Sequence, residues 1–165
     1  MSVKQVRAYL DRWDKGKDII EMDISTATVE LAAAALGVIP ARIAKSMSLR
    51  SGDGGASGGR AGALLVITAG DTKIDNKKFR GHFGFKPKML TPEEALEHTG
   101  HAIGGVCPFA LPPGLEVYLD DSMKRFQTIF PACGSGNSAI ELTPDELEEY
   151  SQSKGWLDVC IPKEA

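Results

Sequence analysis

Residues 101–109 read His-Ala-Ile-Gly-Gly-Val-Cys-Pro-Phe. Gly104 and Gly105 permit positive φ angles and a close approach of other backbone, because glycine has no Cβ atom. Pro108 fixes its own φ angle and favours an extended conformation at the residue before it. A loop of this composition can present bare backbone N–H and C=O groups to a small ligand. The stretch therefore predicts a ligand-binding loop.

Three further segments stand around this loop in a fixed order. They are Ala44-Lys45-Ser46-Met47 before it, and Val117-Tyr118-Leu119-Asp120 and Ala132-Cys133-Gly134-Ser135 after it. The ordered set, which extends from about residue 25 to residue 147, resembles the YbaK and prolyl-tRNA editing-domain family. The resemblance implies an α/β fold of the α+β type, with a mixed, partly barrel-like β-sheet surrounded by helices. It also implies hydrolysis of mischarged aminoacyl-tRNA, the activity of the family's free-standing members.

The same resemblance implies roles for individual residues. Lys45 would contact the terminal adenosine end of the tRNA, and the backbone of Gly104 and Gly105 would polarise the ester carbonyl and position a water. Physically this is an oxyanion hole, in which fixed N–H donors stabilise charge that develops in the transition state. The other expected substrate-binding residues are Ser46, Met47, Val106, Cys107, Pro108, Phe109, Asp120, Gly134 and Ser135.

The length and composition suit a single domain over residues 1–165. A chain of 165 residues with 42% hydrophobic content can bury one core and is short for two. The sequence contains no apolar run near ~20 residues, and its first residues lack the apolar core of a signal peptide. The three cysteines are odd in number and widely separated, which is typical of free thiols in a reducing compartment. We expect a cytoplasmic protein without membrane contact.

The charge is unevenly distributed along the chain. The formal net charge is −3, which argues against a protein that coats nucleic acid through positive charge alone. Between residues 73 and 88 the balance inverts, with six cations against Asp75. The candidate tRNA contacts in this stretch are Lys73, Lys77, Lys78 and Arg80. A solvated helix face is the alternative interpretation.

Hydrophobic periodicity and capping signals predict alternating helices and strands. Helices are expected at residues 3–13, 27–36, 76–80 and 92–100, and from residue 144. Strands are expected at residues 19–24, 43–49, 63–68, 115–119, 127–130 and 138–142. Thr91-Pro92-Glu93-Glu94 and Thr143-Pro144-Asp145-Glu146 are capping boxes with proline in the first turn. A mixed sheet is favoured over a Rossmann fold, because the chain has neither a strict βαβ period nor a GxGxxG fingerprint.

Three alternatives based on glycine or cysteine residues are weaker. The glycine-rich residues 52–59 lack the order of a phosphate-binding loop and predict a flexible hairpin connection. Cys107 as a nucleophile would need His98 or His101 as its base and a lowered thiol pKa, neither of which the sequence shows. A zinc site from His98, His101, Cys107 and Cys133 matches no recognised ligand spacing. We therefore predict no metal and no cofactor.

The hypothesis that follows is a free-standing deacylase acting in trans on a small mischarged amino acid such as alanine, cysteine, serine or threonine. Proline tRNA is a candidate carrier, and an aminoacyl-tRNA synthetase is a candidate partner besides the mischarged tRNA. The alternative is a non-catalytic nucleotide or aminoacyl-tRNA binding module on the same fold. The amino acid, the tRNA and the oligomeric state have no residue-level signature in this sequence.

Overall fold

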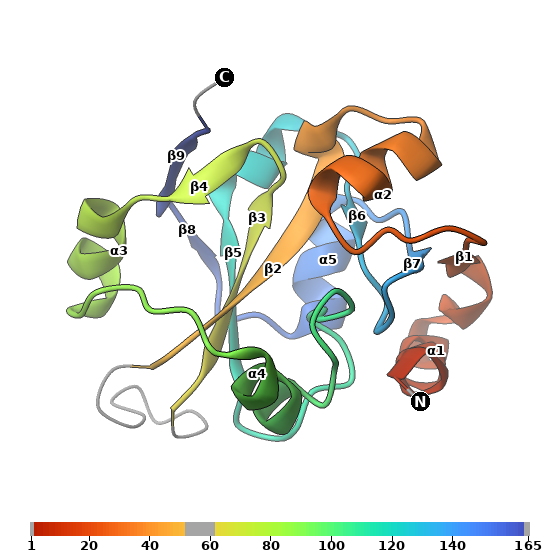
Figure 1. Ribbon diagram of the computed structural model, residues 1–165, viewed down its shortest axis with the longest axis horizontal. Coiled ribbons are helices and arrows are strands. Elements are labelled where there is room, and N and C mark those ends of the chain that lie inside the picture. The colour runs from red at the N-terminus through yellow and green to blue at the C-terminus, as the bar shows by residue number, and fades with distance from the viewer. Residues whose placement is uncertain (1, 52–61, 164–165) are drawn as a thin grey trace.

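A computed structural model describes residues 2–51 and 62–163 of the chain (Figure 1). The predicted hairpin connection at residues 52–59 lies outside the described residues.

The centre of the molecule is a five-stranded sheet with strand order β6-β2-β3-β5-β8. Strands β2 and β3 pair antiparallel, whereas the β2·β6, β3·β5 and β5·β8 pairs are parallel. The sheet is thus mixed, and the predicted fold class is confirmed. Its strands are β2 Ile43–Leu49, β3 Leu64–Ala69, β5 Glu116–Asp120, β6 Phe130–Pro131 and β8 Trp156–Leu157.

Strand pairing continues beyond the edge of this sheet. Strand β1 (Ile20–Glu21) pairs antiparallel with β7 (Ser138–Ala139), and β4 (Thr72–Ile74) pairs with β9 (Cys160–Pro162). An isolated bridge between Ala132 and Ala139 joins the segment after β6 to β7. The sheet therefore wraps around on the β6 side, in keeping with the predicted partly barrel-like shape.

Helices lie around the sheet on both faces (Figure 1). They are α1 Ser2–Leu10, α2 Val29–Leu36, α3 Asn76–Phe83, α4 Pro92–Thr99 and α5 Pro144–Ser151. Both predicted capping boxes form, at the starts of α4 and α5. Helix α2 begins later than the sequence predicts, because Thr28 caps it rather than Ser25 or Thr26: its hydroxyl accepts the N–H of Leu31 at 3.2 Å.

Alternating side chains of the central strand β3 pack into two separate hydrophobic cores. Leu65 and Ile67 belong to the main core, to which α1, α4 and α5 contribute, whereas Leu64 and Val66 pack with Phe79 of α3 on the other face. Every residue of β3 is buried. A third cluster packs α2 against the start of β2 and Phe130. The sheet is therefore covered on both sides, and openings occur where its strands diverge.

The sequence predicts strand ends poorly. The expected strand at residues 19–24 is only β1, with two exposed residues, and those at 127–130 and 138–142 are reduced to β6 and β7. Strands β4, β8 and β9 are absent from the prediction. Each has two or three residues, and such short strands depend on distant partners more than on their own pattern.

Candidate functional site

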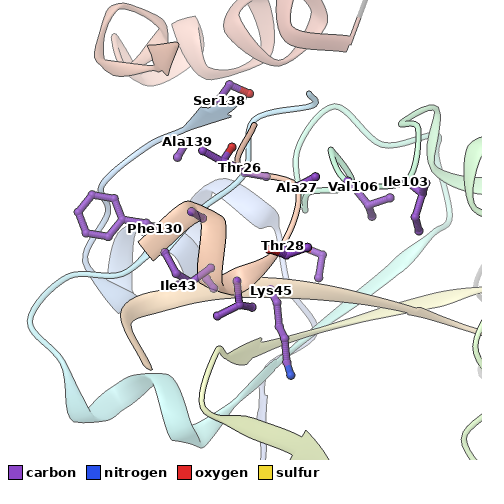
Figure 2. A pocket seen from close by; sticks show the side chains of 16 residues that line it. Thr26, Ala27, Thr28, Ile43, Lys45, Ile103, Val106, Phe130, Ser138 and Ala139 are labelled. Atoms are coloured by element: carbon purple, nitrogen blue, oxygen red, sulfur yellow. The ribbon is translucent and has the colours of Figure 1, made fainter. Parts of the chain in front are cut away.

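A cavity of about 200 Å³ opens where β6 leaves β2 (Figure 2). The two strands pair only at Ile43–Phe130 and Ala44–Pro131. Further along the same edge of β2, the next backbone contact is the N–H of Leu90 to the carbonyl of Ser48. The edge of β2 around Lys45 and Ser46 is therefore left facing the cavity. The lining comprises Thr26, Ala27, Thr28, Val29, Ala32, Ile43, Ala44, Lys45, Ser46, Ile103, Gly104, Val106, Phe130, Ala132, Ser138 and Ala139.

The segment before α2 forms one wall and is fixed in place by backbone contacts. The N–H of Thr26 donates to the carbonyl of Gly136, and the Thr26 hydroxyl donates to the same oxygen at 3.2 Å. Gly104 closes against this wall, because a Cβ atom there would lie 3.2 Å from the Cβ of Ala27. Its φ of +91° is a second reason for glycine.

The two glycine-bearing loops touch each other at Gly105. A Cβ atom at this position would lie 2.6 Å from the backbone nitrogen of Ser135 and 2.7 Å from the carbonyl carbon of Gly134. The N–H of Gly105 also donates to the carbonyl of Ala102 at 2.9 Å. Gly105 thus joins the loops and does not offer its N–H to the cavity.

Two other N–H groups of the loop are candidate donors to a ligand. Gly104 and Val106 line the cavity, and neither N–H has an acceptor within residues 2–51 and 62–163. The hydroxyl of Ser46 is a third group of this kind, being buried and without a hydrogen-bond partner among the described residues. These groups give the cavity polar atoms on walls that are otherwise mostly apolar.

Lys45 contributes its proximal carbons to the cavity, but its ammonium points elsewhere. Figure 2 shows the side chain directed away from Ala27 and Val106, and Nζ donates to the carbonyl of Thr72 at the start of β4. Burial, and secondarily the charge of Lys163, lowers the pKa of Lys45. To reach a ligand in the cavity, the ammonium must exchange this carbonyl for another acceptor.

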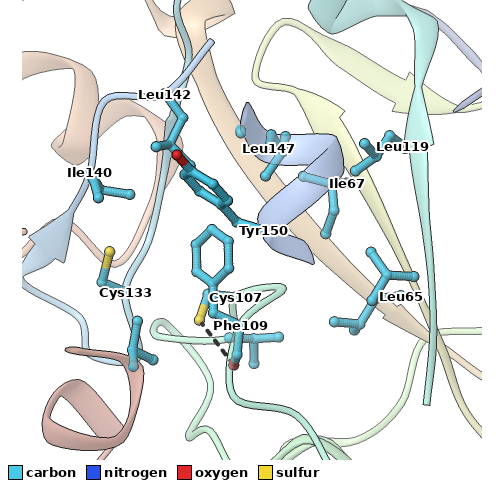
Figure 3. Packing of buried hydrophobic residues seen from close by; sticks show 14 of the residues in the cluster. Leu65, Ile67, Cys107, Phe109, Leu119, Cys133, Ile140, Leu142, Leu147 and Tyr150 are labelled. Carbon is cyan, nitrogen blue, oxygen red and sulfur yellow. Dashed lines mark hydrogen bonds between the residues drawn. The ribbon is translucent and has the colours of Figure 1, made fainter. Parts of the chain in front are cut away.

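Cys107 lies in the main core behind the loop and not on the cavity wall (Figure 3). Its Sγ atom is 3.5 Å from Nε2 of His101, which lies 2.8 Å from the carbonyl oxygen of Phe109. Because a carbonyl only accepts, Nε2 carries the proton and cannot take one from the thiol. Burial raises the pKa of Cys107 to about 12 and lowers that of His101. An activated cysteine nucleophile has a lowered pKa and a base that can accept its proton, and this pair has neither.

Several other predicted substrate-binding residues stand outside the cavity. The side chain of Phe109 belongs to the main core, and Met47 packs against the cluster on the α3 face. Asp120 is 2% exposed and accepts the N–H groups of Ser122 and Val159, each at 2.9 Å. Its carboxylate therefore fastens the end of β5 to the C-terminal strands.

Ser135, on the second glycine-bearing loop, is one step removed from the cavity. Its hydroxyl donates to the hydroxyl of Ser138, a lining residue, at 2.8 Å. Gly134 and Pro108 do not line the cavity. The structure thus brings Lys45, Ser46, Gly104 and Val106 together and places the other predicted residues around them.

Three of the predicted tRNA contacts, Lys77, Lys78 and Arg80, lie on α3, which Figure 1 shows at the opposite side of the molecule from α2 and β7, and Lys73 lies on β4. Lys73, Lys77 and Arg80 are exposed, whereas Lys78 pairs with Asp158 at 2.9 Å and also donates to the carbonyl of Cys160. The structure does not bring these four residues to the cavity.

Several lining residues carry no signal that marks them in the sequence. Thr26, Ala27, Ile103, Phe130 and Ala139 are small or apolar and come from four separate segments. Only the folded arrangement identifies them as one wall. Within the described ranges no group of three or more histidine, cysteine, aspartate or glutamate side chains could hold a metal ion. None of the helices described there is long and apolar enough to cross a bilayer.

Comparison with known proteins gives a consistent set of relatives. Residues 24–150 match the aminoacyl-tRNA editing domain. The chain is 58% identical to uncharacterized protein YwhH of Bacillus subtilis (strain 168), with 97% of this chain and 98% of the relative covered. A crystal structure described as a candidate trans-editing enzyme for prolyl tRNA synthetase superposes with a TM-score of 0.82 at 30% identity, covering 99% and 98% of the two chains.

Similarity also extends to part of a larger enzyme. The chain is 24% identical over 152 residues to the proline–tRNA ligase of Thermosipho melanesiensis (strain DSM 12029 / CIP 104789 / BI429). The match covers 92% of this chain but only 25% of the ligase.

Proposed function

Because the chain belongs to the aminoacyl-tRNA editing-domain family, we propose that it is a free-standing deacylase that hydrolyses the ester of a mischarged aminoacyl-tRNA. The cavity between β2, α2 and the Gly104 loop is the observation that carries this proposal. It offers a small apolar volume beside a lysine and two backbone N–H groups. The reaction consumes water and yields a free amino acid and an uncharged tRNA, and we place it in the cytoplasm, where tRNA is charged.

The size and lining of the cavity support a small amino acid. Its walls are rich in alanine, threonine and serine, and its volume is about 200 Å³. Synthetases mischarge close analogues, because one methylene contributes only ~1–3 kcal/mol to discrimination. Alanine, cysteine, serine and threonine are the proposed substrates. The similarity to proline–tRNA ligases supports proline tRNA as the carrier.

In the proposed mechanism the N–H groups of Gly104 and Val106 bind the ester carbonyl oxygen. A water attacks the carbonyl carbon, and negative charge develops on the oxygen that these donors bind. The ester bond to the ribose oxygen then breaks, and that oxygen takes up the proton that the attacking water gives up. Gly105 contributes by joining the two loops rather than as a donor.

Lys45 is proposed to bind the 3′-terminal nucleotide. A half-buried ammonium needs a partner oxygen, which Thr72 supplies in this structure. A long lysine side chain can rotate from this carbonyl to an oxygen of the substrate. The Ser46 hydroxyl, which has no partner among the described residues, is proposed to contact the amino acid.

A non-catalytic binding module remains the second candidate, and one observation favours it. The residues that line the cavity in the described part of the chain include no carboxylate, histidine or cysteine. Catalysis would therefore depend on backbone donors, water and the substrate's own hydroxyl. Binding alone would need only the pocket.

The test is hydrolysis of tRNAs charged with alanine, cysteine, serine, threonine and proline. We expect selective deacylation by the native protein and a loss of roughly a hundredfold or more in Lys45→Ala, by analogy with removal of one transition-state contact. Lys4→Ala, at an exposed lysine of α1, is the matched control. Tight binding of tRNA without turnover on any substrate would favour the binding module, and a fully active Lys45→Ala protein would remove the lysine from the mechanism.

A further inference from the structure

A second hollow, of about 290 Å³, lies on the α3 face of the sheet and is lined by rings. Its aromatic members are His82, Phe83, Phe85 and Tyr118, and Ser51, Leu64 and Leu157 complete the lining. None of these residues lines the cavity beside Lys45. The His82-Phe83-Gly84-Phe85 stretch has no role in the proposed deacylation.

The rings form a preorganised cluster. Phe83 meets Tyr118 edge-on, with ring centroids 5.0 Å apart, and lies 6.0 Å from Phe85. Phe79, which is fully buried, holds Phe83 from beneath at 4.5 Å. Phe83, Phe85 and Tyr118 are only half-buried. Part of the Phe83 and Phe85 rings is thus open to a ligand, and little ordering is required on binding.

Positive charge adjoins the rings. A shallow depression on the same helix is lined by Asn76, Lys77, Arg80, Gly81, Gly84 and Lys86. Its three cations make no ion pair with any other described residue, in contrast to Lys78, which Asp158 neutralises at 2.9 Å. The charge beside the rings therefore remains available to an anionic partner, although the protein as a whole is acidic.

Aromatic rings beside unneutralised cations match one class of ligand better than others. Nucleobases stack on aromatic side chains, while lysine and arginine hold the phosphates that connect them. An acidic peptide would satisfy the cations but has few flat groups for the rings, and paired bases cannot leave their stack without cost. From this we infer that the hollow between α3 and β5 binds a base of unpaired RNA, with its phosphates held by Lys77, Arg80 and Lys86.

The position of the hollow relates it to the cavity. Lys45, Met47 and Leu49 alternate along β2, and Met47 and Leu49 pack into the cluster that contains the rings. The ammonium of Lys45 also lies towards this side, at Thr72 of β4. From Lys45 to Ser51, which lines the hollow, the chain advances about 20 Å. The hollow and the ammonium of Lys45 thus lie on the same side of the sheet. The identification of the RNA as tRNA rests on the proposed function.

The test uses fluorescence anisotropy with a short single-stranded RNA that has the sequence of a tRNA 3′ end. Phe85→Ala should weaken binding roughly tenfold, the effect of losing one base stack. Phe85→Leu, which better preserves volume, should show a similar loss without its stacking face. A set of RNAs with one base removed at each position in turn should identify the position whose removal weakens the native protein but not Phe85→Ala.

The cations are tested by charge reversal. Lys77→Glu combined with Lys86→Glu should weaken binding and flatten its dependence on salt, because fewer counterions are released. Lys4→Glu, on α1 at the other side of the molecule (Figure 1), should leave both unchanged. Equal affinity for duplex RNA, or unchanged affinity in both Phe85 variants with circular dichroism like the native protein's, would overturn the inference.

The outcomes of these tests distinguish the base-binding site from the proposed deacylase activity. Binding that depends on Phe85, with no deacylation of any charged tRNA, would support the base site and reject the deacylase. Deacylation with KM unchanged in Phe85→Ala would support the deacylase and reject the base site.

Discussion

Gly105 shows how one residue joins the two loops of the candidate site. A methyl group there would meet the backbone of Gly134 and Ser135 at 2.6–2.7 Å, and backbone cannot move aside as a flexible side chain can. We expect Gly105→Ala to cost roughly 1–3 kcal/mol of stability, as overpacking does, and to reduce deacylation by displacing Gly104 and Val106. Urea unfolding and the deacylation assay measure the two effects.

Gly81 provides the matched control within α3. A Cβ atom at this glycine meets nothing within 4 Å. Since alanine suits a helix better than glycine, Gly81→Ala should be neutral or stabilise by roughly 0.5–1 kcal/mol. Equal stability of the Gly105 and Gly81 variants would show that the loops can separate without cost.

Cys107 should be unreactive while the protein is folded. It is fully buried, and burial raises its pKa to about 12, so that its thiolate forms only in strong alkali. We expect no alkylation of Cys107 by iodoacetamide near pH 8 in the native protein and rapid alkylation in denaturant, as read by mass spectrometry. Cys107→Ala should keep deacylase activity. Selective labelling of the folded protein that abolishes activity would instead support a thiol mechanism.

At the scale of elements, the first residue of β4, Thr72, supplies the carbonyl that holds Lys45, directly after the turn between β3 and β4. Arg125 braces this turn through two hydrogen bonds to Asp71, at 2.6 and 3.0 Å, and these bonds are the main reason why the pKa of Asp71 is lowered. A carboxylate with a depressed folded-state pKa stabilises fully above its unfolded pKa of about 4, and this contribution is lost as pH falls through the folded value.

Asp71→Asn tests this brace. Both partners are partly exposed, so we expect a loss of at most about 1 kcal/mol near neutral pH. The difference from the native protein should be smaller at about pH 3 than at about pH 7, because the contribution of Asp71 is lost as pH falls below its unfolded pKa of about 4. Urea unfolding at the two pH values measures it, with Asp14→Asn, whose side chain is 91% exposed, as the control. A difference that grows in acid would contradict the assigned pKa shift.

Helices and strands could be predicted where the sequence signal for them lies within a few neighbouring residues. The starts of α4 and α5 are encoded within four residues each, and the structure forms both capping boxes. Strand β2 was predicted with its observed ends, because Pro40 signals the turn that precedes it. Strands β4 and β8 have no such local signal. Strand β4 forms by pairing with β9, and β8 forms by pairing with β5. Pairing across this distance is a property of the fold and not of a short window.

Some residues of the candidate site could likewise be predicted from the sequence, and others could not. Lys45 and the Gly104 loop carry distinctive residues, so the sequence could single them out. Ala27 and Ala139 belong to the cavity only because α2 and β7 meet there. The direction of the Lys45 ammonium, and the use of the Gly105 N–H by Ala102, are set by backbone geometry that residue types alone do not reveal.

At the scale of the whole molecule, the main core includes residues outside the region that matches the editing domain. The editing-domain match covers residues 24–150, yet Val6 and Leu10 of α1 are fully buried in the same cluster as Leu147 of α5. On the other side, Lys154 donates its N–H to the carbonyl of Val117 in β5 at 2.7 Å. These contacts support the proposal that residues 1–165 form one cooperative domain.

The two tryptophans allow a direct test, since each lies in one flank outside the matched region. Trp13 packs against Tyr150 with ring centroids 4.7 Å apart, and Trp156 donates from Nε1 to Glu148 at 2.8 Å. Trp13→Phe and Trp156→Phe each leave one reporter. We expect the fluorescence transition of each variant in urea to coincide with its own far-UV circular dichroism transition, as two-state unfolding requires. In each variant the remaining tryptophan reports on its own flank. If its fluorescence changes at a lower urea concentration than the circular dichroism signal, that flank unfolds separately, and the domain is limited to the matched region and the other flank.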